Sequence, residues 1–223
     1  MIKLIEENSG YISCLDENFK DLKTDISNWK LTIRQYMETK SMSEYEKNEV
    51  LDKAKLQVES ILVKNDLTFP YNVCLKDFDL KRDIYFRTSA CYQKESFIKG
   101  TILIEIKSHL ICNNIDIITH MILHEYSHAI YEVALTHNFY LLIEINKLQK
   151  YYTLLDYKTS SIKNEFELAK EQFCEFFPFY LMGRIVSENV KTEYPIIRLP
   201  EAEREEVEKI CTKIVKDFMC TFK

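Results

Sequence analysis

The residue pattern with the clearest chemical meaning in this 223-residue chain is His124-Glu125-Tyr126-Ser127-His128. On a helix, positions i and i+4 lie one above the other on the same face, so His124 and His128 can both direct a ring nitrogen at one metal ion. Glu125 is turned by about 100° from His124, where its carboxylate can reach a water molecule bound to that metal. Zinc with two such histidines, a third protein ligand and an open fourth position is the hydrolytic arrangement of metallopeptidases.

The residues around this motif predict a buried helix over residues 114–136. This stretch has no Gly and no Pro, and Asn113 or Asn114 is suited to cap its start. Two histidines and a glutamate are costly to bury without partners, and a bound metal is such a partner. The alternative is a pair of hydrogen-bonded core histidines, which explains the intervening Glu125 less well. The apolar residues that follow helical spacing on one side are Ile115, Ile118, Ile122, Tyr126, Ala129 and Val133.

His120 extends the histidine row by one more turn. One tetrahedral ion cannot bind three histidines spread along two helical turns, so we expect His120 to be structural. The metzincin class requires a Gly and a further His where this chain has Tyr131 and Ala134, which excludes that class.

A third ligand is expected from the segment 167–177. Glu167, Glu171 and Glu175 are spaced by four and share one helix face. One carboxylate can bind zinc, and a second, one turn further on, can accept the Nδ1–H of a ligand histidine. A row of glutamates can equally be a solvated helix face, but the phenylalanines interleaved with it favour a functional row. Pro178 is expected to break or kink this helix soon after Glu175.

The two motifs together resemble those of a known group. Residues 124–128 read H-E-Y-S-H and residues 171–177 read E-Q-F-C-E-F-F. This pair is similar to the gluzincin family that includes the catalytic domain of anthrax lethal factor and the clostridial Pro-Pro endopeptidases. The resemblance covers roughly residues 47–223 and implies that Glu171 is the third zinc ligand. It also maps the second glutamate of the family motif onto Glu175 and the family alanine onto Cys174, a small-for-small exchange.

One position departs from the family pattern. The family carries a catalytic tyrosine seven residues before its third ligand, where this chain has Asn164. Tyr157 and Tyr152 are the candidates to stabilise the oxyanion in its place. The departure leaves a second interpretation open, a metal-binding regulatory or interaction module of the ImmA/IrrE type or an inactive metallopeptidase-like fold.

The elements expected around the motifs make an α+β fold, helix-rich and zincin-like, with a small mixed sheet ahead of the active-site helix. Residues 1–46 are predicted to be an N-terminal helical extension and residues 47–223 the metallopeptidase domain. Strand 102–106 is expected to be the edge strand that pairs with an extended peptide substrate. The predicted helices are 15–39, 43–65, 139–152, 165–188 and 200–222, and the predicted strands are 66–75, 83–92 and 100–108.

The composition of the chain indicates which kind of partner and which cellular compartment to expect. Net charge is −5 with basic and acidic residues interspersed, so a protein or peptide substrate is expected and no nucleic acid. No stretch is apolar enough to span a bilayer. The seven cysteines form no C-x-x-C pair, which favours free thiols in a reducing compartment. With no hydrophobic leader visible, we expect a cytoplasmic location or export without a cleaved signal peptide.

These observations predict a zinc-dependent metalloendopeptidase of the gluzincin type with one Zn²⁺ per chain. Its expected ligands are His124, His128 and Glu171, and Glu175 orients a ligand histidine. Glu125 is the expected general base toward a zinc-activated water.

Overall fold

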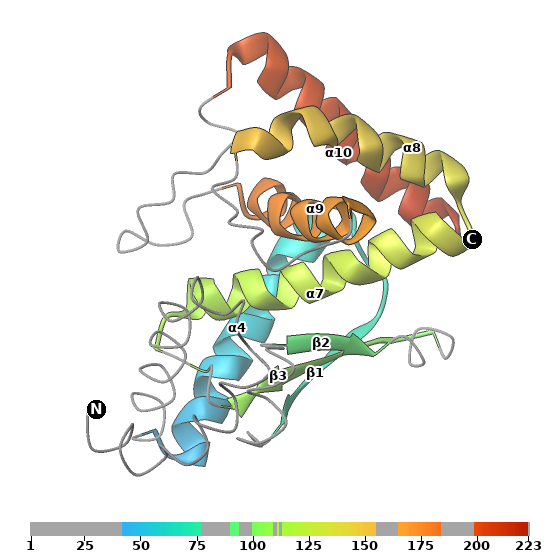
Figure 1. The fold of residues 1–223 in the computed structure, drawn as a ribbon. Coiled ribbons are helices and arrows are strands. Elements are labelled where there is room, and N and C mark those ends of the chain that lie inside the picture. Colours follow the sequence, from blue (N-terminus) through green and yellow to red (C-terminus); the bar gives the residue numbers. More distant parts are fainter. Residues whose placement is uncertain are drawn as a thin grey trace, which may run out of the picture.

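The computed structural model describes residues 42–76, 90–93, 100–108, 111, 113–154, 165–183 and 199–222. These residues form an α+β arrangement of helices around a small sheet (Figure 1). The first 41 residues lie outside the described ranges, and with them the predicted helix 15–39 and most of the predicted extension 1–46. The elements are α4 (Glu44–Lys64), β1 (Tyr71–Lys76), β2 (Ala90–Gln93), β3 (Ile102–Lys107), α7 (Ile115–Thr136), α8 (Phe139–Lys147), the 3₁₀ helix η3 (Leu148–Leu154), α9 (Glu165–Met182) and α10 (Glu201–Cys220).

The described strands form a mixed sheet in the order β1-β3-β2. β3 runs parallel to β1, with Tyr71 opposite Ile102, and antiparallel to β2, with Ala90 opposite Ile106. The prediction of a small mixed sheet ahead of the histidine helix is therefore confirmed. Strand β1 starts later than predicted, because Asp66 adopts a left-handed turn (φ 58°) after α4 and the extended pairing begins at Tyr71.

The prediction that strand 102–106 is an edge strand is wrong. β3 is hydrogen-bonded on both sides and is the central strand, so its backbone is not open to a substrate. Ile102, Ile104 and Ile106 are fully buried on one face. That alternation looks the same in a central strand and in a half-buried edge strand, so the sequence pattern could not separate them.

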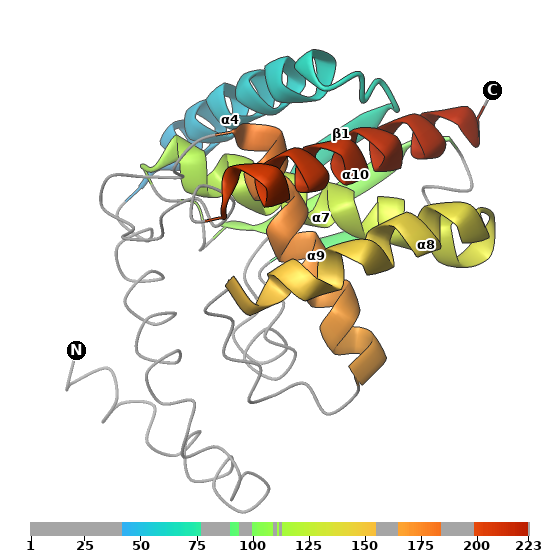
Figure 2. The same ribbon diagram turned by 90° about the horizontal axis from the view of Figure 1, so that it is seen from above.

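Helix α7 lies between the sheet and helix α9, and α4 packs beside it (Figures 1 and 2). The side chain of Asn114 caps its start by accepting from the backbone N–H groups of Asp116 (3.0 Å) and Ile117 (3.3 Å). The predicted apolar stripe is confirmed, because all but its first residue are fully buried. The core therefore holds α7 rigidly from both sides. The fully buried stripe residues are Ile118, Ile122, Tyr126, Ala129 and Val133.

Pro178 was predicted to break or kink helix α9. The helix continues through Pro178 to Met182, so it is not broken there. A proline removes one helical hydrogen bond, but the phenylalanines around it are buried and hold the helix in place by packing. The helix ends before the predicted residue 188. Gly183, at φ 58°, donates its N–H to the carbonyl of Phe179 at 3.1 Å, a left-handed cap that glycine adopts without strain.

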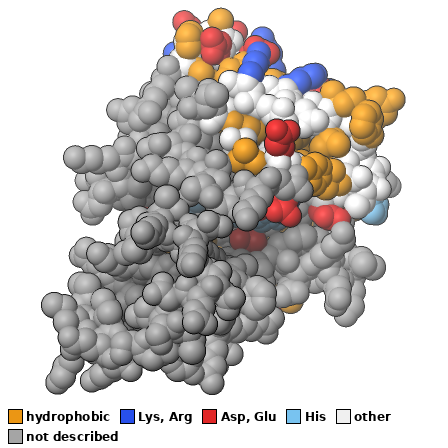
Figure 3. Space-filling view, viewed as in Figure 1, with side chains coloured by type: hydrophobic (Ala, Val, Ile, Leu, Met, Phe, Trp, Pro, Cys, Tyr) orange, Lys and Arg blue, Asp and Glu red, His pale blue; other side chains and the backbone are white. Residues whose placement is uncertain are grey.

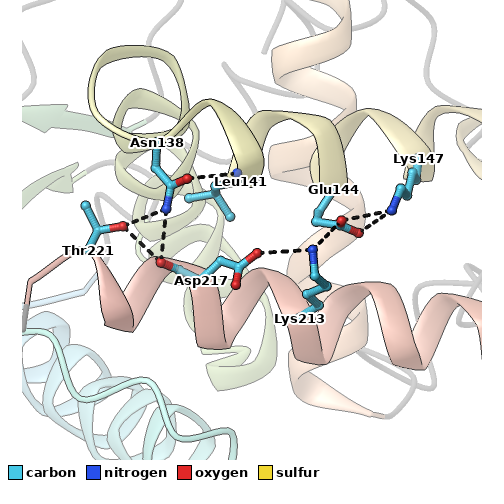
Figure 4. Close-up of polar contacts among 7 residues, drawn as sticks. All are labelled: Asn138, Leu141, Glu144, Lys147, Lys213, Asp217 and Thr221. Atoms are coloured by element: carbon cyan, nitrogen blue, oxygen red, sulfur yellow. Dashed lines mark hydrogen bonds and ion pairs between the residues drawn. The ribbon is translucent and has the colours of Figure 1, made fainter.

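Helices α8 and α10 run antiparallel and are joined by polar contacts (Figure 4). Asn138 caps α8 by accepting from the N–H of Leu141 and donates to Thr221 at 2.9 Å. The carboxylate of Glu144 is nearly buried and accepts from Lys147 and Lys213. These contacts fix the C-terminal helix against the helix that follows α7.

Two further features were also expected from the sequence. Among the described helices, none combines the length and apolar character needed to cross a bilayer. The described cysteines Cys74, Cys174, Cys211 and Cys220 are free thiols. Helix α8 carries three exposed hydrophobic side chains, those of Phe139, Tyr140 and Ile143. In Figure 3, hydrophobic side chains gather in the region where Figure 1 shows α8.

Candidate metal centre

Helices α7 and α9 bring three metal-binding side chains to one point. The Nε2 atoms of His124 and His128 lie 3.5 and 3.6 Å from the same carboxylate oxygen, Oε2 of Glu171. Two ligand atoms placed about 2.1 Å from a tetrahedral zinc ion are separated by about 3.4 Å. One ligand atom from each residue lies within 4.8 Å of the others. The spacing therefore fits a group that could bind a metal ion.

The other ring nitrogen of each histidine is also in contact with α9. Nδ1 of His124 lies 3.2 Å from Oε2 of Glu175, and Nδ1 of His128 lies 3.2 Å from Sγ of Cys174. Glu171, Cys174 and Glu175 occupy positions i, i+3 and i+4, which share one face of a helix. Each imidazole is thus held at Nδ1 while its Nε2 points toward Glu171, the orientation a metal ligand requires.

The pKa values of the two histidines are shifted in opposite directions. Burial alone opposes protonation of His124, but hydrogen bonds to Glu171 and Glu175 outweigh it and raise its pKa to about 10. Burial and the neighbouring His124 lower the pKa of His128 to about 4. Burial would raise the pKa values of Glu171 and Glu175, but hydrogen bonds to His124 hold both below the ordinary value. The centre therefore favours a proton on His124, and a metal ion that binds Nε2 must displace it.

Glu125 is buried, with 8% of its surface exposed, and lies next to His124 on α7. Its negative charge contributes to the raised pKa of His124, so its carboxylate is close to the centre. The group of convergent ligand atoms consists of His124, His128 and Glu171 and does not include Glu125. This position suits a group that acts on a molecule bound at the metal rather than on the metal itself.

His120 lies one turn before His124 and packs its ring against Phe179, with centroids 4.7 Å apart. Its Nε2 is 3.7 Å from Oε1 of Glu175, and burial lowers its pKa. His120 thus contacts the carboxylate that holds His124, and it is not among the convergent ligands. This agrees with the expectation that it does not share the metal.

Lys170 adds a cation at the other side of the candidate ligand Glu171. Its Nζ is 3.6 Å from Oε1, while Oε2 faces the two histidines. The two carboxylate oxygens therefore have different partners, which favours binding of a metal through Oε2 alone. Lys170 was not predicted, because a lysine next to a glutamate in sequence is common on solvated helices.

Of the two tyrosines predicted as oxyanion stabilisers, the structure describes Tyr152. Tyr152 is 3% exposed, its hydroxyl donates to the carbonyl of Ile145 at 3.5 Å, and its ring packs near Phe176. Its described hydrogen bond is thus made within the core. Tyr157 and Asn164 lie outside the described residues.

Cys174 is a second residue at this centre whose contact the sequence did not reveal. It is fully buried, and burial raises the pKa of its thiol well above the ordinary value, so the sulfur next to His128 is a neutral thiol. Its place between Glu171 and Glu175 was visible in the sequence, but only the crossing of α7 and α9 shows which histidine it meets.

Comparison with protein-family models, curated proteins and solved structures gives no match. What the centre does must therefore be inferred from its own donor atoms and their surroundings. Two imidazoles and one carboxylate form the donor set of catalytic zinc sites that keep a fourth position for water or substrate.

Proposed function

We propose that this protein is a zinc-dependent metalloendopeptidase of the gluzincin type, with a zincin-like fold and one zinc ion bound by His124, His128 and Glu171. The observation that carries the proposal is the convergence of two Nε2 atoms on one oxygen of Glu171, with Glu125 beside His124. An isolated pair of buried histidines would not require a carboxylate from another helix at the same point.

The surroundings of the three ligands support a catalytic rather than a purely structural metal. Structural zinc sites are usually closed by four protein ligands, most often including cysteine. The convergent group here offers three, and Cys174, the cysteine described at this centre, faces Nδ1 of His128 and not the ligand atoms. The described residues therefore leave a fourth position for water or substrate.

A zinc ion held by these three residues would supply a Lewis acid for the scissile carbonyl and would lower the pKa of a water molecule. Glu125 accepts the proton of that water as its oxygen adds to the carbonyl carbon. The C–N bond then breaks, and Glu125 returns the proton to the departing amine, so the products are a carboxylic acid and an amine. The remaining proton passes from the acid to the amine, which leaves a carboxylate and an ammonium group. Glu175 holds the ring of His124 in its ligand orientation throughout.

A second function is favoured by one specific observation. The family tyrosine is replaced by Asn164, and Tyr152 makes its described hydrogen bond within the core. A chain that binds the metal but stabilises the oxyanion poorly would serve as a regulatory or interaction module of the ImmA/IrrE type, or as an inactive relative of the peptidases. The presence of Glu125 favours the peptidase.

A cleavage screen separates these two functions. The purified protein with zinc is incubated with a broad peptide library, and new termini are detected by mass spectrometry. A peptidase produces cleavages that a chelator abolishes, that added zinc restores, and that Glu125→Gln lacks. Zinc binding without any such cleavage across the library supports the regulatory module and contradicts the peptidase.

A further inference from the structure

We propose that Cys174 is a positioning residue that accepts the Nδ1–H of His128 and so fixes the ring of this ligand toward the metal. This inference rests on the proposed metal centre and adds a residue to it. Sγ of Cys174 and Nδ1 of His128 are 3.2 Å apart, within hydrogen-bonding reach for a sulfur acceptor.

The tautomer follows from the position of the other ring nitrogen. Nε2 of His128 faces Oε2 of Glu171 at 3.6 Å. A neutral histidine that binds a metal through Nε2 carries its hydrogen on Nδ1. Because the ring lies against a fully buried thiol, that N–H needs an acceptor, and the sulfur of Cys174 is the one beside it.

The two ligand histidines are therefore held by groups of different strength. His124 faces the carboxylate of Glu175, whereas His128 faces a thiol, which is a weak and uncharged acceptor. Acceptors at this position orient the ring and tune the ligand, and their removal typically weakens metal binding about 10- to 100-fold. Because the contact with sulfur is weak, we expect Cys174→Ala to reduce zinc affinity by about tenfold, the low end of this range.

The chain provides a matched control for a purely packing role. Cys211 on α10 is also fully buried and free, and its thiol is likewise kept protonated by burial. Cys211→Ala therefore removes the same atoms from the core at a position outside the convergent ligand group. Cys174→Ser is the rescue variant, because a hydroxyl oxygen can accept the same N–H.

The test measures the zinc dissociation constant of each variant by competition with a chromophoric chelator at one pH. We expect Cys174→Ala to bind zinc about tenfold more weakly. Cys174→Ser should stay within about threefold of the wild type, because its oxygen replaces the sulfur acceptor. Cys211→Ala should bind zinc as the wild type does, whatever its thermal stability. Equal affinity for wild type and Cys174→Ala, or an equal loss in Cys211→Ala, would overturn the inference.

A second readout keeps the inference testable if Cys174→Ala does not fold. Proton–nitrogen NMR of the zinc-loaded protein reports the Nδ1–H of each ligand histidine. Replacing sulfur by oxygen in Cys174→Ser should shift the His128 signal and leave that of His124 unchanged, and an unshifted His128 signal would overturn the inference. Failure of the proposed function looks different, since it appears as a wild-type protein that binds no zinc or cleaves no peptide.

Discussion

Nδ1 of His124 lies 3.2 Å from Oε2 of Glu175, which is one helical turn beyond the candidate ligand Glu171 on α9. One helix therefore supplies both a candidate ligand and the group that contacts the ring of another candidate ligand. The spacing of four residues makes this possible, because Glu171 and Glu175 project from the same face.

This contact predicts a graded loss of metal affinity at Glu175. Glu175→Ala should weaken zinc binding by about 10- to 100-fold without abolishing it, because it removes the acceptor for the Nδ1–H of His124. Glu175→Gln keeps an amide oxygen near Nδ1 of His124, so its zinc affinity should fall less than that of Glu175→Ala. Chelator competition measures both, with Glu167→Gln as the control, since Glu167 is exposed one turn before Glu171. An affinity that falls equally in the control would show that helix charge, and not the contact, is responsible.

The raised pKa of His124 predicts the pH dependence of metal binding. The metal-free centre keeps a proton on His124 at pH values below about 10, and a metal ion on Nε2 excludes that proton. Zinc affinity should therefore rise with pH by up to about tenfold per unit between pH 6 and 8.5. A histidine with its ordinary pKa of 6.5 would give a plateau above about pH 7. Zinc dissociation constants measured across this pH range distinguish the two cases. A zinc affinity that stays constant above about pH 7 would contradict the raised pKa of His124.

The same proton affects the stability of the metal-free protein. A group whose pKa is raised on folding contributes stability that is fully present below its ordinary pKa of 6.5 and is lost as pH rises through about 10. Metal-free protein should accordingly be less stable to urea at pH 9.5 than at pH 6.5. His124→Ala should reduce this dependence, and a wild type with equal stability at both pH values would contradict the assignment.

Glu144 is expected to stabilise the fold through the contacts drawn in Figure 4. Its nearly buried carboxylate accepts from Lys147 at 2.8 Å and from Lys213, and Glu144→Gln should lower the free energy of unfolding by about 1–2 kcal/mol. Burial raises its pKa, but the two lysines lower it more, to below the ordinary 4.5. The difference between wild type and variant in urea unfolding should thus be present above pH 4.5 and shrink as pH falls further. Glu208→Gln, exposed on α10, is the control.

Much of the centre could be predicted from sequence because its signals are local. His124 and His128 share a face at any helical register, and Asn114 caps the helix as expected. The spacing of Glu171 and Glu175 likewise required only that α9 be a helix.

The features that could not be predicted depend on contacts between distant segments. Strand β3 is central because β1 and β2 pair with it on its two sides. The alternation of buried and exposed residues along β3 does not show which strands pair with it. Helix α9 passes through Pro178 because tertiary packing outweighs local propensity. Cys174 and His128 are 46 positions apart in sequence, and they meet only because the helices α7 and α9 cross.

Glu125 is expected to serve hydrolysis and not metal binding, so its substitution should separate the two. Glu125→Gln removes the base but keeps the size of the side chain, so the variant should retain zinc and lose at least about 100-fold in peptide cleavage. Metal content and cleavage rate are measured on the same preparation. Loss of the metal would show that Glu125 is a ligand, and unchanged cleavage would show that it is not the base.

Elemental analysis of the purified protein shows whether His124, His128 and Glu171 bind one metal ion. We predict about one zinc per wild-type chain and loss of zinc from His124→Ala, His128→Ala and Glu171→Ala. His137→Ala, at the exposed end of α7, should keep the full amount. Stoichiometric zinc in both His124→Ala and His128→Ala, or a wild-type protein that takes up no zinc, would contradict the assignment of these three ligands.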